Sequence, residues 1–445
     1  MANYISKRGA NVAPSYATTD DLPASTEVGD LVFVGGQLGI AVSASSYQTC
    51  DKTDILPILA GVSSANILNP NTYDGSSNSD FFGASVSVSM KYAIAGANKE
   101  DTDAYDNNSG VAYIFDPKTG SLLQTLANPN AYSTAQNDNF GFDSDISDSH
   151  AIVGAPGEDS AANGGVGKAY IFNASTGSLV HTLNNPDDGY YDQFGDAVSI
   201  GNTYAIVGAR ESGSNNTGKA WIYSVSTGSV VHTLTPGHTA TENYGDSVAI
   251  SDTHAIVGAP RAVPSLDQGK AYIYSTTTGN LLYTLTAPGT PTSIRFGWSV
   301  GISDTHAIVG MSEANHGKAY IYALSTGALV YTLSNPNTNS SHSGDGFGYS
   351  VDICNKWAIV AAVYEDVGVV NSGTVYVYDM TDGSLEYTFE NPNLYGVLVN
   401  DRMGYTLGGR GVAISDGYAI AGIMQEDRLY GSTVTNDSGA ICIFK

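Results

Sequence analysis

The sequence has little positive charge and few charged residues of either sign. Its 445 residues include 18 Lys and Arg against 43 Asp and Glu, which gives a formal net charge of −25. Such a chain repels the phosphates of DNA and RNA, so we expect no nucleic-acid partner. Charged residues make up only 14% of the chain, so the surface must consist mainly of Ser, Thr, Asn, Gly and Tyr.

Cysteines and long apolar stretches are also scarce. Cys50, Cys354 and Cys442 are far apart and show no CxxC spacing, which argues against a zinc site or a disulfide framework and predicts three free thiols. No stretch approaches the roughly 18 apolar residues that span a membrane. Residues 1–8 have no apolar run of the kind found in signal peptides. We therefore expect neither membrane insertion nor export through a cleaved signal.

What the sequence does contain is a repeat. A Phe-Gly dipeptide, or a close variant, recurs every 50 to 58 residues. The seven copies are Phe82-Gly83, Phe140-Gly141, Phe194-Gly195, Tyr244-Gly245, Phe296-Gly297, Phe347-Gly348 and Met403-Gly404. A repeat of this period is typical of a propeller or a solenoid.

One unit shows what each repeat forms. Residues 296–303, 306–310, 317–323 and 328–333 are short β-type segments separated by turn residues such as Asp304-Thr305 and Thr326-Gly327. Four short strands joined in this way predict one antiparallel blade. No apolar stripe of period 3.6 occurs, so we expect almost no helix.

The prolines and glycines at the ends of the strands predict how the ring closes. Seven prolines follow fourth strands, from Pro70 to Pro392, but only six glycines mark the hairpin between third and fourth strands, from Gly120 to Gly383. The last unit therefore lacks a fourth strand, and residues 64–70, SANILNP, match the missing piece. Joining segments about 380 residues apart costs about 5 kcal/mol, which burial of two apolar side chains at about 2 kcal/mol each and about four strand hydrogen bonds at about 1 kcal/mol each offset.

We therefore predict an all-β protein with two parts. Residues 61–445 form a seven-bladed β-propeller, closed by N-terminal strand exchange so that 64–70 lie beside 439–445. Residues 1–60 form a small attachment segment that contains β-structure, with a hairpin over 31–43 that turns at Gly35-Gly36.

The unit FG-x-SV-x-IS…AIVGAP…GKAYIY…TGSL…TL resembles the FG-GAP repeat, the unit of the seven-bladed propeller in integrin α subunits and many microbial surface proteins. Gly154-Ala155-Pro156 and Gly258-Ala259-Pro260 match the second half of that name, and the resemblance covers about residues 64–445. In that family some repeats carry a calcium loop after the second strand. The resemblance implies calcium ligands at Asp101, Asp103 and Asp106, although no Gly follows a third alternating acid here.

Acidic residues recur at the same loop in other units, for example Glu158-Asp159 and Glu365-Asp366, whereas unit four has Ala262 there. A second interpretation is therefore that these carboxylates accept backbone N–H bonds within the turn. Both interpretations stay open at this point, and calcium is the one cofactor that the sequence suggests.

The histidines do not form a catalytic pattern. His150, His254 and His306 begin second strands where other units have Tyr or Trp, and His181 and His232 occupy a fourth-strand position held elsewhere by Tyr. We interpret them as packing residues and expect no enzymatic activity. A carbohydrate-active enzyme, the alternative, would require two carboxylates about 5–9 Å apart at one mouth of the ring.

Residues 20–41, DDLPASTEVGDLVFVGGQLGIA, resemble a short module of virion and tail-fibre proteins of marine bacteriophages, without the Trp that often ends it. This resemblance implies a bacteriophage virion structural protein, in the tail or capsid. Residues 1–60 would bind other virion proteins, and the propeller would contact a host-surface glycan or protein, or neighbouring subunits. The alternative is a calcium-binding extracellular adhesin or matrix protein of a microbe. Either way, we expect any ligand at the loops before each Phe-Gly pair or after the second strands.

Overall fold

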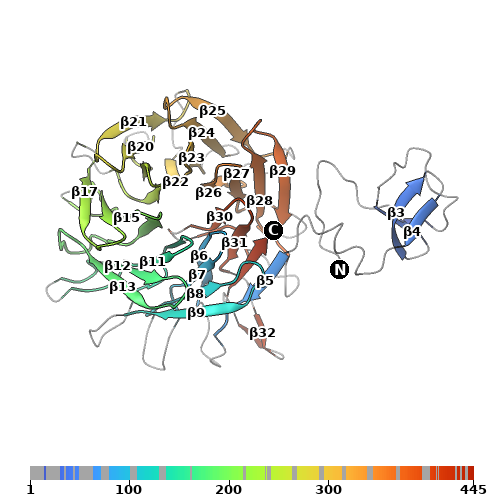
Figure 1. Cartoon of the computed structure of the whole chain (residues 1–445), viewed down its shortest axis with the longest axis horizontal. Helices are drawn as coiled ribbons and strands as arrows, with labels where there is room; N and C mark the ends of the chain where they lie inside the picture. Colours follow the sequence, from blue (N-terminus) through green and yellow to red (C-terminus); the bar gives the residue numbers. More distant parts are fainter. Residues whose placement is uncertain are drawn as a thin grey trace.

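The computed structural model describes the backbone of most of the repeat region and of a small N-terminal sheet. The described residues are 64–71, 80–100, 108–129, 137–160, 163–213, 217–235, 237, 242–262, 268–289, 295–312, 317–337, 344–366, 371–392, 401–406, 408, 410–425 and 439–445, with the strand backbones 15–16, 31–34, 37–43, 46–49, 428–430 and 433–435. Seven four-stranded antiparallel sheets form a ring (Figure 1). The described residues contain no helix, and so no helix that could cross a membrane.

Six blades follow the chain in order, each with its first strand at the centre and its fourth at the periphery (Figure 1). Blade 1 is β6 (Phe82–Val88), β7 (Ala93–Ala97), β8 (Val111–Phe115) and β9 (Leu122–Ala127). Blade 2 is β10 (Ser144–Ile146), β11 (His150–Ala155), β12 (Lys168–Asn173) and β13 (Leu179–Asn184). Blade 3 is β14 (Ala197–Ile200), β15 (Tyr204–Ala209), β16 (Lys219–Ser224) and β17 (Val230–Leu234).

The next three blades repeat this arrangement. Blade 4 is β18 (Ser247–Ile250), β19 (His254–Ala259), β20 (Lys270–Ser275) and β21 (Leu281–Thr286). Blade 5 is β22 (Phe296–Ile302), β23 (His306–Met311), β24 (Lys318–Ala323) and β25 (Leu329–Ser334). Blade 6 is β26 (Phe347–Ile353), β27 (Trp357–Ala362), β28 (Thr374–Asp379) and β29 (Leu385–Glu390).

Blade 7 closes the ring by strand exchange, as predicted. Its strands are β30 (Val412–Ile414), β31 (Ala419–Ile423), β34 (Ala440–Phe444) and, from the other end of the repeat region, β5 (Ser64–Leu68). β5 pairs antiparallel with β34, and Ile67 lies opposite Ile441. The Cys442 thiol donates to Asn66 Oδ1 at 3.1 Å across this pair. The seam therefore has a paired strand where an open sheet edge would otherwise remain.

The hydrophobic core is divided among the interfaces between blades. Seven buried clusters each draw on two adjacent blades, including one that joins blade 7 to blade 1. The residue before the glycine of each Phe-Gly pair, aromatic in six copies and Met403 in the seventh, is fully buried. Phe82, for example, lies 5.8 Å from Tyr113 and 6.0 Å from Phe115, ring centroid to ring centroid. Each blade is thus a two-sided sheet, which explains the continuous apolar runs in second and third strands.

Glycines permit the close approach of neighbouring blades. Gly195 of the third Phe-Gly pair has φ +93°, a conformation that L side chains rarely adopt. A Cβ atom on Gly154, in the second strand of blade 2, would lie 1.9 Å from the Gly195 carbonyl oxygen. The Phe-Gly and Gly-Ala-Pro signatures therefore meet across a blade interface, and a side chain at either glycine would force the blades apart.

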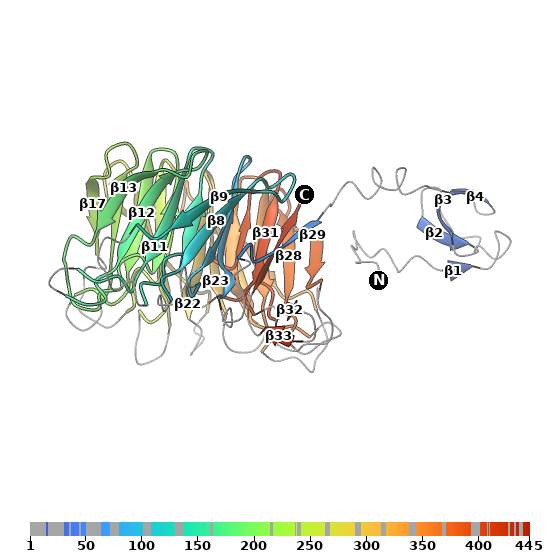
Figure 2. The same ribbon diagram turned by 90° about the horizontal axis from the view of Figure 1, so that it is seen from below.

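The strand directions give the ring two different rims. The turns between first and second strands and the hairpins between third and fourth strands lie on one side, the hairpin rim (Figure 2). The connections between second and third strands, and those between blades, leave from the opposite side, the loop rim. β32 (Arg428–Tyr430) and β33 (Thr433–Thr435) form a separate two-stranded sheet within one such connection.

The N-terminal region forms a sheet of its own. Its order is β1 (Ser15–Tyr16), β2 (Leu31–Val34), β3 (Gln37–Ser43) and β4 (Ser46–Thr49), and it shares no described strand with a blade. β2 and β3 pair antiparallel across positions 35 and 36, so the predicted hairpin is confirmed. The sheet also contains β1, parallel to β2, and β4, which the sequence pattern did not predict.

Candidate functional site

Polar side chains on the first strands link neighbouring blades around the central channel. A first strand is an inner sheet edge, and its outward N–H groups have no strand partner. Asp143 of blade 2 accepts from Val198 N of blade 3 at 2.8 Å. Asp145 accepts from Ser199 Oγ at 2.7 Å and from Ile200 N at 2.9 Å. These carboxylates therefore satisfy backbone donors of the next blade.

The same arrangement recurs on the other side of the ring. Ser350 Oγ of blade 6 accepts from Gly411 N at 3.1 Å and Val412 N at 3.2 Å, and Asp352 accepts from Ile414 N at 3.0 Å. The alternate polar positions after each Phe-Gly pair thus have a structural role. Sequence reasoning did not find this role, because the partner of each side chain is about 50 residues away.

An insertion in the last repeat, just before the first strand of blade 7, reaches the central channel. Val86 follows Gly83 by three positions, whereas the equivalent Val412 follows Gly404 by eight, so the last repeat has five extra residues. Thr406 Oγ1 donates to the Ala84 carbonyl at 2.9 Å. The insertion therefore contacts blade 1 across the interface between blades 7 and 1.

Arg410 ends this insertion and lies among three channel carboxylates, Asp143 and Asp145 of blade 2 and Asp352 of blade 6. Its guanidinium is 3.2 Å from Asp145 Oδ1 of blade 2, and the side chain is 11% exposed. Burial raises the pKa of Asp143 and of Asp352 to about 6, and Arg410 opposes this shift in both. The three carboxylates in turn hold Arg410 in its charged form by raising its pKa.

A second arginine, which is partly exposed, bridges blades 3 and 4. Arg210 lies 3.2 Å from both Asp196 and Asp246. Burial raises the pKa of Asp196 to about 7, against the opposing charge of Arg210. A cavity of about 40 Å³ between Arg210 and Arg410 is also lined by Trp298, and this volume is sufficient for a few water molecules. The arginines and carboxylates of the channel form ion pairs and hydrogen bonds with one another across blade interfaces. These interactions hold neighbouring blades together.

The glutamates after the second strands bond to tyrosines. Tyr113 Oη donates to Glu100 at 2.5 Å, and Tyr170 Oη donates to Glu158 at 2.5 Å. Blade 6 repeats this pair with Glu365 and Tyr376 at 2.7 Å. For Glu158 and Glu365 the proposed turn N–H partner is wrong, because each side chain bonds to a tyrosine on the third strand of its own blade.

The aspartates that follow two of these glutamates do behave as expected. Asp159 Oδ1 accepts from Gly165 N at 2.7 Å, and Asp366 Oδ1 accepts from Asn371 N at 2.7 Å, both within the turn. Where unit four has Ala262, the carboxylate comes from a different loop: Tyr272 Oη donates to Glu242 at 3.4 Å. The third-strand tyrosine thus retains an acceptor even where the usual acid is missing.

The predicted calcium ligands Asp101, Asp103 and Asp106 lie outside the described residues, so calcium at that loop stays a prediction. Among the residues that the structure describes, no group of three or more His, Cys, Asp or Glu side chains could hold a metal ion. Of the cysteines, Cys354 and Cys442 are free thiols, and Cys50 lies outside the described part.

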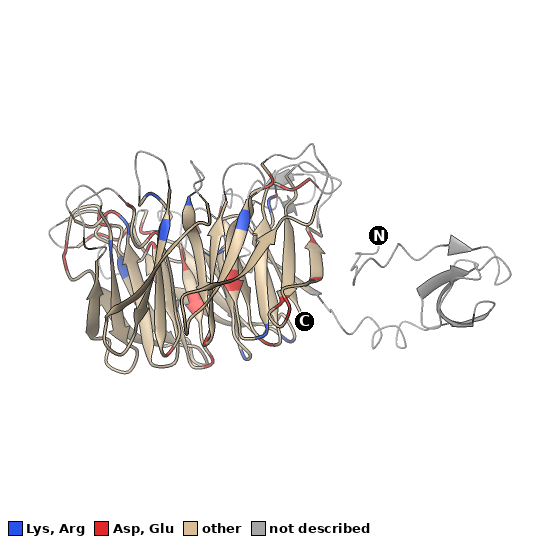
Figure 3. Cartoon of the chain, turned by 90° about the horizontal axis from the view of Figure 1, so that it is seen from above, with Lys and Arg blue, Asp and Glu red and all other residues tan. Residues whose placement is uncertain are grey.

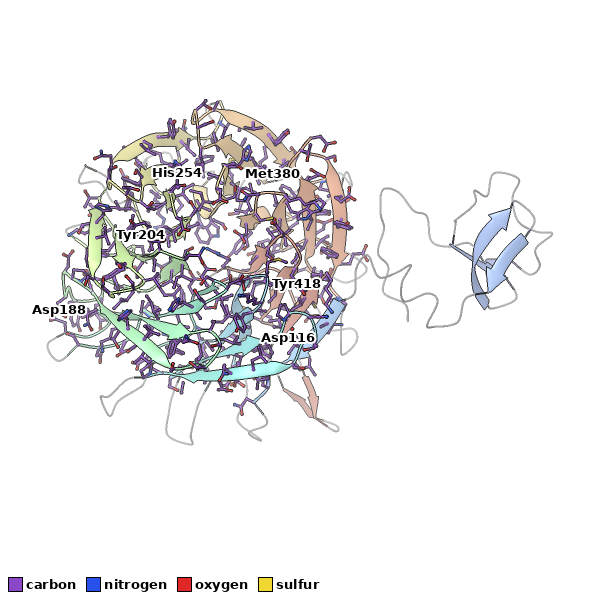
Figure 4. All side chains as sticks on the ribbon, viewed as in Figure 1. Asp116, Asp188, Tyr204, His254, Met380 and Tyr418 are labelled. Carbon is purple, nitrogen blue, oxygen red and sulfur yellow. The ribbon has the colours of Figure 1, made fainter. Side chains whose placement is uncertain are left out.

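The histidines of the second and fourth strands are packing residues, as predicted. The His181 ring packs against Gly228 of the next blade, and His232 packs against Gly279 in the same way. Burial lowers the pKa of His254, whose Nδ1 is 2.9 Å from Thr253 Oγ1. Figure 4 labels His254 with Tyr204 and Tyr418, which occupy the same place in other blades.

The outer strands of blades 2 to 5 form a surface without charge. Residues 169–184, 220–235, 271–286 and 319–334, which we call the uncharged arc, contain no Lys, Arg, Asp or Glu. Figure 3 colours the ribbon at Lys, Arg, Asp and Glu, and most of these positions lie towards the two rims. Two aliphatic residues begin each fourth strand of the arc and are exposed: Leu179, Val180, Val230, Val231, Leu281, Leu282, Leu329 and Val330.

A β-bulge explains why two consecutive residues are exposed in each blade. In blade 2 the register shifts at Ile171/Phe172, so that Phe172 pairs with Leu179 and Ile171 with His181. A bulge bends the strand and disrupts regular alternation. The same shift occurs in blades 3, 4 and 5. The exposed pairs are therefore a regular feature of the fold.

Comparison with known families agrees with this architecture. Five segments match the family described as FG-GAP repeat: 72–115, 130–172, 178–223, 230–274 and 340–378. The chain contains FG-GAP repeats. Blade 5 and blade 7 lie outside the matched segments, yet each has the same four-stranded sheet. No curated protein matches the chain. FG-GAP repeats on a propeller fit an adhesion or protein-contact role.

Proposed function

We propose that this protein is a non-enzymatic contact protein of a bacteriophage particle, whose propeller binds neighbouring subunits or the host surface. The uncharged arc is the observation that carries this proposal. Two copies of a chain with net charge −25 repel each other over most of their surface. The uncharged arc offers aliphatic side chains without that repulsion, on four consecutive blades.

The size of the arc indicates how strong such a contact is. Leu281 and Leu282 are 50% and 42% exposed, and the other aliphatic residues of the arc are similar. Covering four of them, on two blades, gains about 3–4 kcal/mol. This is weak for a contact between free proteins, but sufficient if a second attachment point holds the propeller in place.

Residues 1–60 would supply that second attachment point. The sheet β1–β4 shares no described strand with a blade, as suits a module that docks independently. Residues 20–41 resemble a virion module of marine bacteriophages. The particle is therefore the proposed location, with residues 1–60 on other virion proteins. The direct test is mass spectrometry of purified particles, and recovery of the chain only as free protein would contradict the proposal.

Charge insertion tests the arc itself. Val231→Glu and Leu282→Glu place a carboxylate where blade 6 naturally has Glu386, so we expect both variants to fold. We expect the double variant to enter particles poorly compared with the unaltered chain, because it restores repulsion at the contact. Thr119→Glu adds a charge to the exposed hairpin of blade 1, outside the arc, and is the matched control. Equal incorporation of all variants would exclude the arc as a contact surface.

The channel carboxylates support a binding role over catalysis. Asp143, Asp145 and Asp352 each accept bonds from the next first strand, and Arg410 lies among them. A glycosidase needs one carboxyl group free to donate a proton and a second to act on the sugar or on water. These carboxylates are instead part of the links between blades.

A further inference from the structure

One of the seven interfaces between blades differs from the rest at the hairpin rim. Elsewhere, the glycine of a hairpin between third and fourth strands packs on a fourth-strand side chain of the preceding blade. The six contacts are Gln124 with Gly177, His181 with Gly228, His232 with Gly279, Tyr283 with Gly327, Tyr331 with Gly383, and Ala65 with Gly120. Between blades 6 and 7 this hairpin cannot form, because β34 and β5 are not consecutive in the chain.

A cavity of about 180 Å³, which we call the seam cavity, lies at this interface. Figure 1 shows the end of the chain between β29 and β5 at this place. Trp357, Tyr387, Phe389 and Phe444 form its aromatic wall. The Phe389 and Phe444 rings stack at 3.9 Å, and Tyr387 lies 5.9 Å from Trp357 and 6.1 Å from Phe389. Tyr418, labelled in Figure 4, also lines the cavity.

The aromatic wall has larger aromatic side chains than the equivalent positions of other blades. Five other blades have Leu at the position of Phe389, and Tyr or His stands where Trp357 stands. Phe389 is only 6% exposed, whereas Trp357 and Tyr387 are partly exposed. The aromatic wall therefore has one buried ring, Phe389, and two rings with accessible surface, Trp357 and Tyr387.

Charged groups of both signs surround this wall. Lys356, Asp416 and Lys445 line the cavity and are exposed. Lys356 Nζ lies 4.5 Å from the centre of the Trp357 ring. The cavity thus offers an apolar face together with hydrogen-bond donors and an acceptor at its edge. Small-molecule sites commonly combine these features.

We propose that the seam cavity binds one pyranose ring of a glycan. A cavity of about 150 Å³ accepts a six-membered ring such as benzene, so the volume is adequate. The C–H face of a sugar can lie on the aromatic wall, and its hydroxyls can bond to Lys356 and Asp416. An aromatic peptide side chain would fill the same space but would form no hydrogen bonds with the exposed Lys356 and Asp416 at its edge. This inference narrows the adhesion part of the proposed function to one site.

The test uses the full chain labelled with 5-fluorotryptophan. Its three tryptophans, Trp221, Trp298 and Trp357, give three fluorine resonances, and loss of one in Trp357→His assigns the resonance of interest. The probes are methyl glycosides of glucose, galactose, mannose, N-acetylglucosamine and glucuronic acid, with N-acetyl-phenylalanine amide as the peptide probe. We expect at least one glycoside to shift the Trp357 resonance, in a saturable manner, and to leave the other two in place.

Variants borrowed from other blades make the test specific. Trp357→His and Tyr387→His introduce residues that other blades carry at these positions, so we expect both to fold. Each should weaken glycoside binding about tenfold or more, because ring contact is lost. Tyr331→His makes the same change at the interface that Gly383 covers, and should leave binding unaltered. Because Trp357→His lacks the resonance that reports binding, glycoside binding to this variant is measured by calorimetry.

The outcomes separate this inference from the proposed function. No glycoside response at millimolar concentration, a response to the peptide probe alone, or equal weakening in Tyr331→His would each overturn the glycan site. If residues of the chain itself fill the cavity, no glycoside will bind, and this result too would overturn the glycan site. If particle incorporation still depended on the uncharged arc, the contact function would stand while the glycan site failed.

Discussion

Removing the channel arginine is the most direct test of the link between blades. Arg410→Met deletes the cation next to Asp145 and leaves three buried carboxylates without it. Breaking a buried ion pair in this way costs about 3–5 kcal/mol. We expect that loss in the free energy of unfolding at about pH 7.5, an estimate taken from the average cost of such pairs.

The cost should depend on pH with a predictable sign. With Arg410 present, the pKa values of Asp143 and Asp352 are already about 6. Without Arg410 they rise further, so the folded variant takes up a proton near neutral pH that the unfolded chain does not bind. The destabilisation therefore falls by about 1.4 kcal/mol per unit of pH for each such proton as the pH is lowered towards 6.

Urea unfolding followed by tryptophan fluorescence measures this effect, with midpoints compared at two pH values. Arg261→Met, a change at an exposed arginine, is the control and should lie within about 0.5 kcal/mol of the unaltered chain. In Asp145→Asn/Arg410→Met the combined loss should be smaller than the sum of the single losses. A cost below about 1 kcal/mol, or the same cost at both pH values, would refute the assigned role of Arg410.

Three further outcomes are expected. Asn66→Cys, opposite Cys442 in the β5–β34 pair, should form a disulfide on oxidation that shifts mobility on a non-reducing gel; failure to form it would contradict ring closure. Gly208→Ala should lower the free energy of unfolding by about 1–3 kcal/mol, because its Cβ would lie 2.2 Å from a carbonyl oxygen of the next blade, whereas Gly201→Ala meets only ordinary contacts. Burial raises the pKa of Asp196 to about 7, so the folded state binds protons more tightly than the unfolded state. Stability should therefore rise as the pH falls from about 8 to 6.5, and Asp196→Asn should reduce that rise; an unchanged slope would contradict the shift. Above pH 6.5 the half-buried histidines, whose pKa values burial lowers, contribute little to the opposite trend.

The sequence predicted the architecture because its signals are local and repeated. Each Phe-Gly pair, hairpin glycine and terminal proline marks the same point of a blade. The missing hairpin glycine therefore showed that the last unit lacks a fourth strand, and the match of 64–70 to the other fourth strands located it. The predicted strands of blade 5 agree with β22 to β25 within one residue. The predicted ligands Asp101, Asp103 and Asp106 remain a prediction from the family resemblance.

The channel and the seam cavity could not be predicted in this way. Arg410 follows an insertion that the interval between repeats only hints at, and its partner Asp145 lies in another blade. Glu158 was assigned to its own turn, but it bonds to Tyr170 on the third strand of its blade.

The sequence by itself determined the number of blades, the closing strand and the packing role of the histidines, because hydrophobic alternation and turn chemistry act over a few residues. Only the tertiary structure decided which carboxylates lie around Arg410, where uncharged strands lie side by side, and which aromatic side chains line the seam cavity. Those properties depend on distances between residues some 50 to 370 positions apart, and only closure of the ring brings such residues together.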